Sequence, residues 1–462
     1  SAMSIQGEEA VPSSGGAERS LMVNAFSRAT ATNLDPATAA LLDRRERVLG
    51  SANRLFYADP LHPVRGEGAH LFDAQRRDYL DAYNNVPAVG HSNPRVQAAV
   101  AAQLGELNTH TRYLTDAVVA YAERLTAKFP HPLTQVMYAC TGSEAVDLAL
   151  RIARLATGGQ GIIVTRNAYH GTTAAVAEIS PSLGANNRIP ASVALVDAPD
   201  SVRGPGGDAA VAQWVSEIER AIAGFAEQGI PFAGMIVDSV LSSDGLRLDP
   251  AGFLARAAET VRAAGGLYIA DEVQPGFGRT GDWWGFTRHG FVPDLVVLGK
   301  PMGNGVPISA VVGTRELFDA FGQSTRYFNT FAGNPVSIAA ATAVLDEIED
   351  RGLLEHAAGT GTRLLAGITE IADAQAVRSG RRTVAESRGA GLFLSVEYVL
   401  PGGTEPDPDT TLAVVGALRE RRILVSASGT YENVLKIRPP LVFSDADVAR
   451  FLEGFDEVTR TL

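Results

Sequence analysis

The sequence has little cysteine and no long apolar run, and both shortages narrow what the protein can be. Cys140 is the single cysteine in 462 residues, which excludes an internal disulfide and is typical of a reducing cytosol. No apolar run approaches the roughly 20 residues that a membrane-spanning helix needs. The N-terminal stretch is rich in Ser, Gly and Glu and lacks the basic-then-apolar pattern of a signal peptide. We therefore expect a cytoplasmic protein without a membrane partner, and a disordered tail over residues 1–30.

Positive charge is also in short supply. The chain carries 40 Lys and Arg residues against 52 Asp and Glu residues, a formal net charge of −12. This balance argues against general binding to nucleic acid or to an anionic membrane, although it is compatible with a local basic pocket. We expect no nucleic-acid partner, and we predict no metal site.

What the sequence does contain is a regular alternation of strand and helix patterns, in a chain long enough for two or three lobes. Short apolar runs rich in Ile, Val and Leu alternate with amphipathic stretches, which predicts an α/β protein with a mostly parallel, doubly wound sheet. Residues 203–208 (RGPGGD) interrupt the alternation and are predicted to form a flexible insertion. The predicted strands are 135–139, 162–165, 233–238, 267–270 and 295–298, and the predicted helices are 145–155, 210–227 and 250–264.

Shorter elements flank this central region. We place a boundary near residue 345, between a large domain (91–345) and a smaller C-terminal α+β domain (346–462). We predict that the N-terminal segment, 31–90, packs with the smaller domain. The flanking elements predicted from the sequence are a helix at 34–50, a hairpin at 69–72 and 78–80, helices at 94–107, 116–129 and 410–421, a long helical stretch over 335–350 and onward, and strands at 391–396 and 434–437.

An acid and an amine follow two of the predicted buried strands. Asp271 follows the apolar run 267–270, and Lys300 follows the run 295–298. Ligands of open α/β sheets lie beyond the carboxyl ends of the strands, so both groups are expected in one crevice. Desolvation lowers the pKa of such a lysine and favours Schiff-base or proton-transfer chemistry, while such an aspartate can keep a pyridine nitrogen protonated. A structural ion pair is the alternative, but it leaves Gln274 and the glycine-rich loop 276–281 unexplained.

Three further motifs can serve a phosphorylated ring, and each has a plain structural alternative. Gly142 and Ser143, in T-G-S-E, stand where a helix begins, so they form either an ordinary helix cap or a phosphate site. Tyr169, in Y-H-G, follows a strand and is either a ring-stacking residue or a packed tyrosine in a turn. Thr330, in N-T-F-A-G-N-P, belongs to a polar turn that can donate to a phosphate. Lys436 and Arg438 alternate along a predicted strand, and we expect only one of them to face the crevice.

Together these motifs resemble the class III, ornithine-aminotransferase-like family of enzymes that depend on pyridoxal 5′-phosphate. The resemblance covers roughly residues 55–460 and rests on D-E-V-Q-x-G-x-G-R-T-G, P-D-L-V-x-x-G-K, T-G-S-E, Y-H-G, T-F-A-G-N-P and R-P-P-L in family order. It implies a fold type I transferase with a large cofactor-binding domain. It also implies a homodimer whose site is shared between the subunits.

The resemblance also implies a role for each cofactor residue. Lys300 forms the Schiff base with the cofactor and Asp271 meets the pyridine nitrogen. Gln274 lies by the ring hydroxyl and Tyr169 over the ring face. Gly142 and Ser143 hold the cofactor phosphate, and Thr330 reaches it from the neighbouring subunit.

The sequence departs from many family aminotransferases after the strand that ends at Asp238. Those enzymes have Glu-Pro and a second Glu five residues after the first, whereas this chain has Ser243 at the second position. In ornithine-type enzymes that second Glu pairs with an arginine that binds carboxylates, and Lys436 occupies the position of this arginine. An unpaired cation in a cleft destabilises the protein unless an anion is regularly bound beside it. We therefore expect Lys436 to form a permanent binding site for an anion.

Segments near the N-terminus are similar to the phospho-lyase branch of the family. They include N-N-V at 84–86, L-N-T-x-T-R-Y-L at 107–114 and Y-A-E-R-L at 121–125. We therefore predict a carbon–oxygen lyase that eliminates phosphate from O-phosphoethanolamine to give acetaldehyde, ammonia and phosphate. An amine or amino-acid aminotransferase and a phosphohydroxylysine phospho-lyase are the alternatives. The predicted substrate-binding residues are Lys436, as first choice for the substrate phosphate, with Arg54, Tyr57, Arg112 and Arg438.

Overall fold

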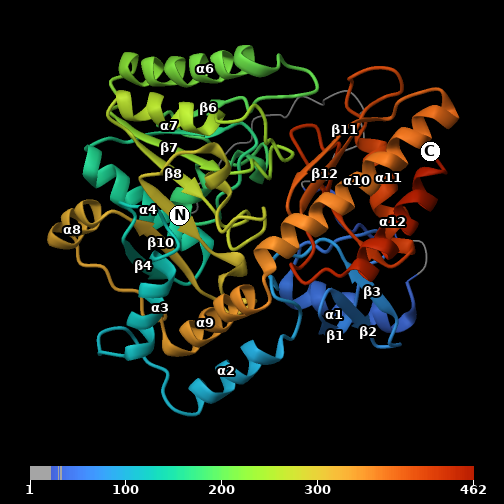
Figure 1. Ribbon diagram of the computed structural model, residues 1–462, viewed down its shortest axis with the longest axis horizontal. Helices are drawn as coiled ribbons and strands as arrows, with labels where there is room; N and C mark the ends of the chain where they lie inside the picture. Colours follow the sequence, from blue (N-terminus) through green and yellow to red (C-terminus); the bar gives the residue numbers. More distant parts are fainter. Residues whose placement is uncertain (1–21, 30, 32–33) are drawn as a thin grey trace, which may run out of the picture.

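Seven strands form the large sheet of the computed structural model, which describes residues 22–29, 31 and 34–462 (Figure 1). The strand order is β4-β10-β9-β8-β7-β5-β6. Only β10 runs antiparallel to its neighbours, and the other pairs are parallel, so the predicted mostly parallel α/β sheet is confirmed. The strands are β4 (Gln135–Ala139), β5 (Gly161–Thr165), β6 (Val193–Val196), β7 (Phe232–Asp238), β8 (Leu267–Asp271), β9 (Leu295–Leu298) and β10 (Ser309–Gly313).

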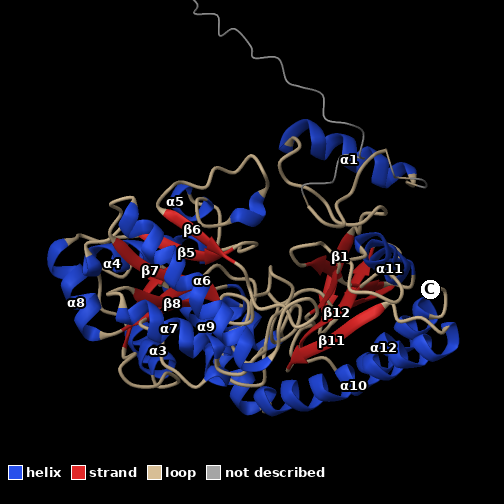
Figure 2. Cartoon of the chain, turned by 90° about the horizontal axis from the view of Figure 1, so that it is seen from above, coloured by secondary structure: helices blue, strands red, loops and turns tan. Residues whose placement is uncertain are grey.

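Each central strand is apolar on both faces because helices cover both. On β8, Tyr268 and Ala270 belong to one buried cluster, and Ile269 belongs to the other. Helix α4 (Gly142–Thr157) fills the second cluster, and α6 (Gly207–Glu227) and α7 (Phe253–Ala263) pack into the first. Figure 2 shows the sheet lying between these helix layers. Near-continuous apolar strands are the expected result of such double coverage.

A second lobe is built from both ends of the chain (Figure 1). The N-terminal strands β1, β2 and β3 form a four-stranded sheet with β13, so the hairpin near residue 70 joins C-terminal chain. The other sheet has the order β11-β12-β15-β14. Strands of this lobe are β1 (Pro63–Glu67), β2 (His70–Asp73), β3 (Asp78–Asp81), β11 (Val384–Ala390), β12 (Phe393–Tyr398), β13 (Ile423–Leu424), β14 (Ser426–Ser428) and β15 (Val434–Ile437), and its long helices are α10 (Leu353–Ser379), α11 (Pro408–Glu420) and α12 (Asp445–Thr459).

Several boundaries differ from the predicted ones. The proposed division near residue 345 falls inside α9 (Pro335–Asp350), and α10 starts only at Leu353. Residues 203–208 are not a loose insertion, because Arg203 is fixed by ion pairs and α6 begins at Gly207. The remaining helices are α1 (Pro36–Leu49), α2 (Pro94–Leu104), α3 (Asp116–Thr126), α5 (Ala174–Ala177) and α8 (Arg315–Ser324).

The predicted N-terminal tail lies mostly outside the described residues. Where the structure does describe it, over residues 22–29, the backbone is tied to the segment before β1. Phe26 N donates to Leu55 O at 2.7 Å, and Tyr57 N donates to Asn24 O at 2.7 Å. The prediction of a disordered tail is therefore wrong for this part of the chain.

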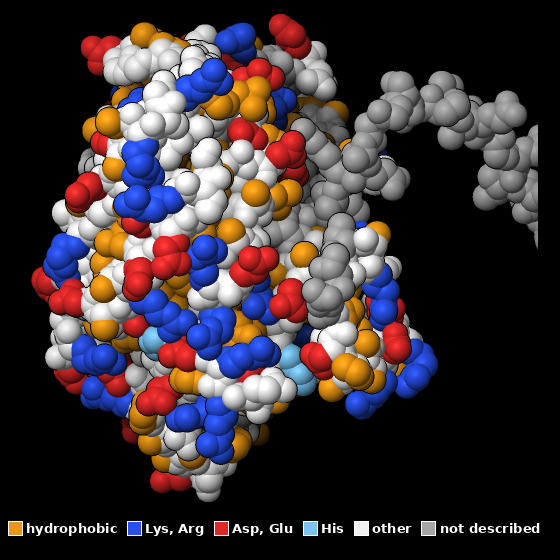
Figure 3. Space-filling view, turned by 90° about the vertical axis from the view of Figure 1, so that its right-hand side faces the viewer, with side chains coloured by type: hydrophobic (Ala, Val, Ile, Leu, Met, Phe, Trp, Pro, Cys, Tyr) orange, Lys and Arg blue, Asp and Glu red, His pale blue; other side chains and the backbone are white. Residues whose placement is uncertain are grey.

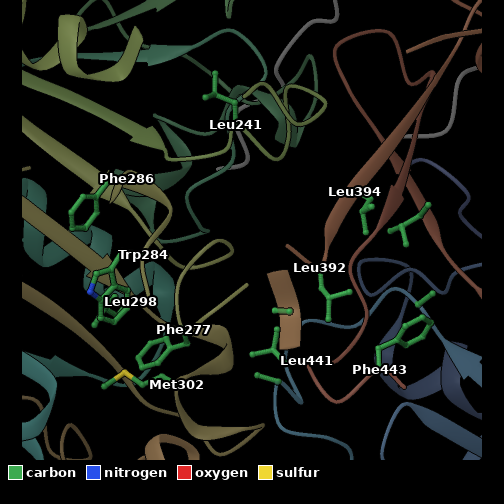
Figure 4. Packing of buried hydrophobic residues seen from close by; sticks show 14 of the residues in the cluster. Leu241, Phe277, Trp284, Phe286, Leu298, Met302, Leu392, Leu394, Leu441 and Phe443 are labelled. Atoms are coloured by element: carbon green, nitrogen blue, oxygen red, sulfur yellow. The ribbon is translucent and has the colours of Figure 1, made fainter. Parts of the chain in front are cut away.

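The largest apolar cluster runs through both lobes. Figure 4 shows Phe277, Trp284 and Leu298 on the side of the large sheet and Leu392 and Leu441 on the side of the smaller lobe. Such a shared core favours a fixed relation between the two lobes.

The outer surface of the smaller lobe is mixed in charge. Figure 3 shows basic and acidic side chains interspersed across this face. Among the described helices, none is long and apolar enough to cross a membrane.

Candidate active site

The carboxyl ends of the parallel strands bring the chemical groups together. Asp238 ends β7, Asp271 ends β8, and Lys300 follows β9 after Gly299. Segment 166–171 follows β5, and Thr141 lies just after β4. The predicted crevice at this edge of the sheet is therefore where the side chains meet.

Lys300 is held in an unusual backbone conformation at the start of a short 3-10 helix, η3 (Lys300–Gly303). Its φ is +24°, a value that non-glycine residues adopt at a cost and that is frequent at functional sites. Burial, followed by the nearby guanidinium of Arg438, lowers the pKa of the Lys300 amine to about 8, against the opposing effect of Asp271 and Asp238. The amine is thus closer to its neutral, nucleophilic form than an ordinary lysine.

Asp271 is buried, and a histidine that the sequence prediction overlooked holds it in place. His170 Nδ1 lies 2.7 Å from Asp271 Oδ2, while Val273 N donates to Asp271 Oδ1 at 3.0 Å. The Nε2 atom of His170 is buried and has no hydrogen-bond partner among the described residues. Next to His170, the ring of Tyr169 has its centroid 5.9 Å from Lys300 Nζ. A flat ring between Tyr169 and Asp271 would meet an aromatic face and a carboxylate.

The N-terminus of α4 forms a close-fitting cradle. The side chain of Thr141 caps the helix and accepts a hydrogen bond from Glu144 N at 3.1 Å. Thr172 N donates to Ser143 Oγ at 3.0 Å, and a Cβ on Gly171 would lie 2.4 Å from the same hydroxyl oxygen. Gly142 packs against Gly299, whose Cβ would lie 3.4 Å from the Cα of Gly142, at van der Waals contact. Free backbone N–H groups, the positive end of the helix dipole and a hydroxyl suit a phosphate here.

Lys436 and Arg438 both act on the crevice, and the prediction that only one of them faces it is wrong. Residues two apart on a strand share a face, since the side-chain period of a strand is two. Burial is the largest cause of the lowered pKa of Lys436, and the positive charges of Arg438 and Lys300 follow, against the opposing charge of Asp238. Burial likewise lowers the pKa of Arg438. The guanidinium of Arg438 donates to Gln274 Oε1 and to Tyr83 O, so it orients the glutamine that the resemblance places by the ring.

Neither Lys436 nor Arg438 forms an ion pair with a carboxylate of the described residues, but Arg438 has the acceptors Gln274 and Tyr83, whereas Lys436 has no hydrogen-bond acceptor among them. Within the described part of the chain no carboxylate forms an ion pair with its amine, which lies 5.9 Å from the centroid of the Phe393 ring. Ser243, at the position of the family acid, is partly buried, and its carbonyl accepts a hydrogen bond from Asn167 Nδ2. A partly buried, unpaired amine beside Lys300 is what a substrate anion would need.

The remaining candidates lie apart from this group. Arg54 is exposed and lines a cavity of about 350 Å³ beside α1. Tyr57 donates its hydroxyl to Val425 O at 2.9 Å, which gives it a packing role in the smaller lobe. Arg112 is exposed, with its guanidinium 3.7 Å from the centroid of the Phe328 ring. The structure brings neither Arg54 nor Tyr57 into contact with the Lys300 group.

Thr330 is exposed in the single chain and lies among exposed apolar side chains. Phe331 is 71% exposed, Tyr113 67% and Leu114 98%, and exposed apolar side chains that gather in one patch mark interaction sites. Asn329 Nδ2 donates to Glu144 Oε1 at 2.7 Å and so ties this turn to the N-terminus of α4.

Two more acids support the site, the half-buried Asp238 and the buried Asp244, and the sequence prediction assigned neither a role. Burial raises the pKa of Asp238. Asp244 accepts from Thr165 Oγ1 at 2.6 Å and from Asn167 N at 3.2 Å, so it ties the loop before Tyr169 to the loop after β7. The sequence does contain a signal for Asp238, which follows an apolar run just as Asp271 does. Nothing in the local sequence indicates a role for Asp244 or for His170.

A deep lysine with a lowered pKa, a buried aspartate and a phosphate-binding helix end, set along the carboxyl edge of a mostly parallel sheet, define a fold type I enzyme that uses pyridoxal 5′-phosphate. The chain belongs to the class III aminotransferase family, whose model matches residues 56–459.

Relatives within this family include both aminotransferases and phospho-lyases. An alanine–glyoxylate aminotransferase 2-like protein of Drosophila melanogaster is 39% identical over 89% of this chain and 85% of its own length. An ethanolamine-phosphate phospho-lyase homologue of Caenorhabditis elegans is 34% identical over 95% and 98%. Among solved structures, a phospholyase from Arthrobacter in complex with phosphoethanolamine is 42% identical, with a TM-score of 0.87, and covers 91% of this chain and 100% of its own.

The residues present fit the cofactor of the family, pyridoxal 5′-phosphate. At the cradle, a Cβ on Gly171 would clash with Ser143 and a Cβ on Gly142 would crowd Val273, so both positions favour glycine, as the close approach of a phosphate to the backbone requires. Asp271 offers a carboxylate to the ring nitrogen, and Lys300 offers the amine that a cofactor aldehyde needs. When bound, the cofactor supplies an electron sink that makes a carbon next to the substrate nitrogen acidic.

Proposed function

We propose that the protein is a carbon–oxygen lyase that eliminates phosphate from O-phosphoethanolamine. The enamine that elimination leaves takes up one water and hydrolyses to acetaldehyde and ammonia. The observation that carries this proposal is Lys436, a partly buried amine that feels the charge of Lys300 and forms no ion pair with a carboxylate of the described residues. The phospholyase from Arthrobacter, which is described in complex with phosphoethanolamine, supports the choice of substrate.

The residues divide the work of such an elimination. Lys300, with its lowered pKa, takes the proton from the carbon that bears the substrate nitrogen. Lys436 binds the substrate phosphate and compensates its charge as it leaves the neighbouring carbon. Asp271, held by His170, keeps a fixed negative charge opposite the ring nitrogen.

The experiment is release of inorganic phosphate from O-phosphoethanolamine by the holoenzyme without a keto acid. We expect steady release of phosphate with one acetaldehyde per phosphate. No release of phosphate would overturn the proposal. Lys300→Ala is the matched control and should release none.

An aminotransferase is the second candidate, since relatives with that name are equally similar. The cofactor residues serve both reactions, and the difference lies in whether Lys300 returns the proton or a leaving group departs first. Conversion of an amine and pyruvate into alanine, at a rate comparable with phosphate release, would favour this candidate. O-Phosphohydroxylysine in the first assay tests the remaining substrate.

The shared homodimeric site is also part of the proposal. A second copy that covers Tyr113, Leu114 and Phe331 would bring its own Thr330 to the cofactor phosphate. The proposed division into an N-terminal segment, a large cofactor domain and a small C-terminal domain agrees with the pairing of β3 and β13.

A further inference from the structure

One face of the C-terminal sheet carries an acid close to Lys436. In the antiparallel pairing of β12 with β15, Ser395 stands opposite Lys436 and Glu397 stands opposite Val434. Residues opposite each other, and residues two apart, share a face, so Glu397 is the diagonal neighbour of Lys436. Diagonal neighbours are about 7–8 Å apart at the backbone, within reach of long side chains. Glu397 is thus an acid within reach of Lys436.

Glu397 is instead surrounded by three arginines. It is fully buried, and its carboxylate lies 2.6 Å from Arg203 Nη1, 2.9 Å from Arg388 Nη1 and 3.3 Å from Arg247 Nη1. Burial alone would raise the pKa of Glu397, but the three guanidinium groups hold it below its ordinary value.

Two of these arginines belong to the large lobe. Arg203 comes from the glycine-rich segment before α6, and Arg247 from the loop after β7 that also carries Ser243. Arg388, on β11, donates to Leu246 O and Gly245 O, both at 2.6 Å, and so holds the same loop against the sheet. The arginine cluster therefore connects the loop that carries Ser243, where the family acid would stand, to β12, which pairs with the strand that carries Lys436.

The charges of the cluster balance. Arg203, Arg247 and Arg388 face Asp200, Glu386 and Glu397, three positive and three negative groups. Removal of Arg203 would leave two positive groups against three negative ones, beside an amine with no partner.

We propose that Arg203 and Arg247 are specificity-determining residues, which hold Glu397 away from Lys436 and so keep Lys436 free for a phosphate or phosphonate group. This inference rests on the proposed function, in which Lys436 binds the substrate phosphate. In ornithine-type aminotransferases the resemblance pairs the cation with an acid in one half-reaction, whereas the arginine cluster here keeps Glu397 occupied.

Binding of 2-aminoethylphosphonate to the holoenzyme tests the inference, since its C–P bond cannot undergo the elimination. Affinity is measured from the change in cofactor absorbance, with propylamine as the probe that lacks an anion. We expect Arg203→Ala to weaken phosphonate binding about tenfold while propylamine binding stays unchanged. In turnover, KM for O-phosphoethanolamine should rise by a similar factor with kcat within about twofold.

Three variants separate this effect from a loss of structure. Arg166→Ala is the matched control, because Arg166 lines the same cavity as Arg203 but pairs with Asp197, at 2.6 Å. Arg203→Lys should retain most of the affinity. Arg203→Ala combined with Glu397→Gln restores the balance of charge at two against two and should restore phosphonate binding.

The outcomes distinguish this inference from the function on which it rests. A wild-type enzyme that neither binds the phosphonate nor releases phosphate overturns the proposed function. A wild-type enzyme that does both, with Arg203→Ala equal to Arg166→Ala, overturns the role of Arg203. So does a double variant that stays as weak as Arg203→Ala, because the loss is then structural.

Discussion

Lys300 combines burial with two opposing sets of charges, and its reactivity should follow its pKa. Burial and Arg438 lower the pKa to about 8, so the neutral amine forms as the pH rises through that value. The rate at which the apoenzyme takes up pyridoxal 5′-phosphate should therefore rise with pH and level off above about 8. Arg438→Met removes a positive charge and should move the midpoint to higher pH.

Arg438→Lys is the control for this measurement, since it retains the charge and should leave the midpoint in place. A wild-type midpoint near the ordinary lysine value of about 10.4 would contradict the assignment.

Lys436 should lower the stability of the ligand-free protein and raise its affinity for an anion. A partly buried amine without an acidic partner destabilises the folded chain unless an anion is bound. Lys436→Met should raise the melting temperature of the ligand-free holoenzyme by about 1–3 °C. The phosphonate should raise the melting temperature of wild type and of Lys436→Arg, but not that of Lys436→Met. A Lys436→Met variant that melts below wild type, or that the phosphonate still stabilises, would refute this reading.

The main catalytic candidates could be named from the sequence because each follows an apolar run, and the carboxyl ends of parallel strands meet at one edge. Partners that lie far apart along the chain could not be named from the sequence. His170 lies 101 residues from Asp271, and Arg203 lies 194 residues from Glu397, so only the fold reveals these pairs. The prediction that Lys436 and Arg438 point to opposite faces was wrong because residues two apart along a strand share a face.

At the scale of elements, several strands were predictable to the residue and others were not. β4, β9 and β15 match their predicted bounds. β10 follows a Gly- and Pro-rich stretch and runs antiparallel, which no local signal indicates. The sequence predicts one long helical stretch from Pro335 onward, whereas the structure divides it into α9 and α10 at Gly352, whose φ of +57° interrupts the helix.

A histidine clasp joins three elements of the smaller lobe. His70 on β2 lies 2.7 Å from Asp78 of β3 through Nδ1 and 2.8 Å from Asp447 of α12 through Nε2. The hydrogen bond to Asp447, and then that to Asp78, raise the pKa of His70 from 6.5 to about 9 despite partial burial. The stability that the clasp contributes is therefore complete below about pH 6.5 and is lost as the pH rises through about 9.

His70→Gln tests the clasp. The melting temperature of wild type should exceed that of the variant at pH 6, and the gap should close between about pH 6.5 and 9. His62→Gln, at an exposed histidine of the same lobe, should show no such gap. A gap for His70→Gln that is constant from pH 6 to 10 would mean that the imidazole charge contributes nothing.

At the scale of the whole molecule, the exposed apolar side chains near Thr330 indicate a surface that a partner subunit buries. Phe328, Phe331, Tyr113 and Leu114 are large, apolar and exposed, and they lie beside a turn that is tied to the phosphate cradle. A second copy related by a twofold axis would cover the same surface on both subunits. Each site would then take Lys300 from one subunit and Thr330 from the other.

Mixed dimers test this arrangement directly. Lys300→Ala abolishes the subunit's own site but leaves its Thr330 intact, whereas Thr330→Ala, assayed at limiting cofactor, weakens the site of its partner. If the two variants are unfolded together and refolded as an equal mixture, half of the dimers are mixed and each has one intact site. Activity should therefore return to roughly a quarter of the wild-type value, although each variant alone is nearly inactive. Refolding each variant separately before mixing is the control. No recovery in the co-refolded sample, with Thr330→Ala still inactive, would show that Thr330 serves the site of its own subunit.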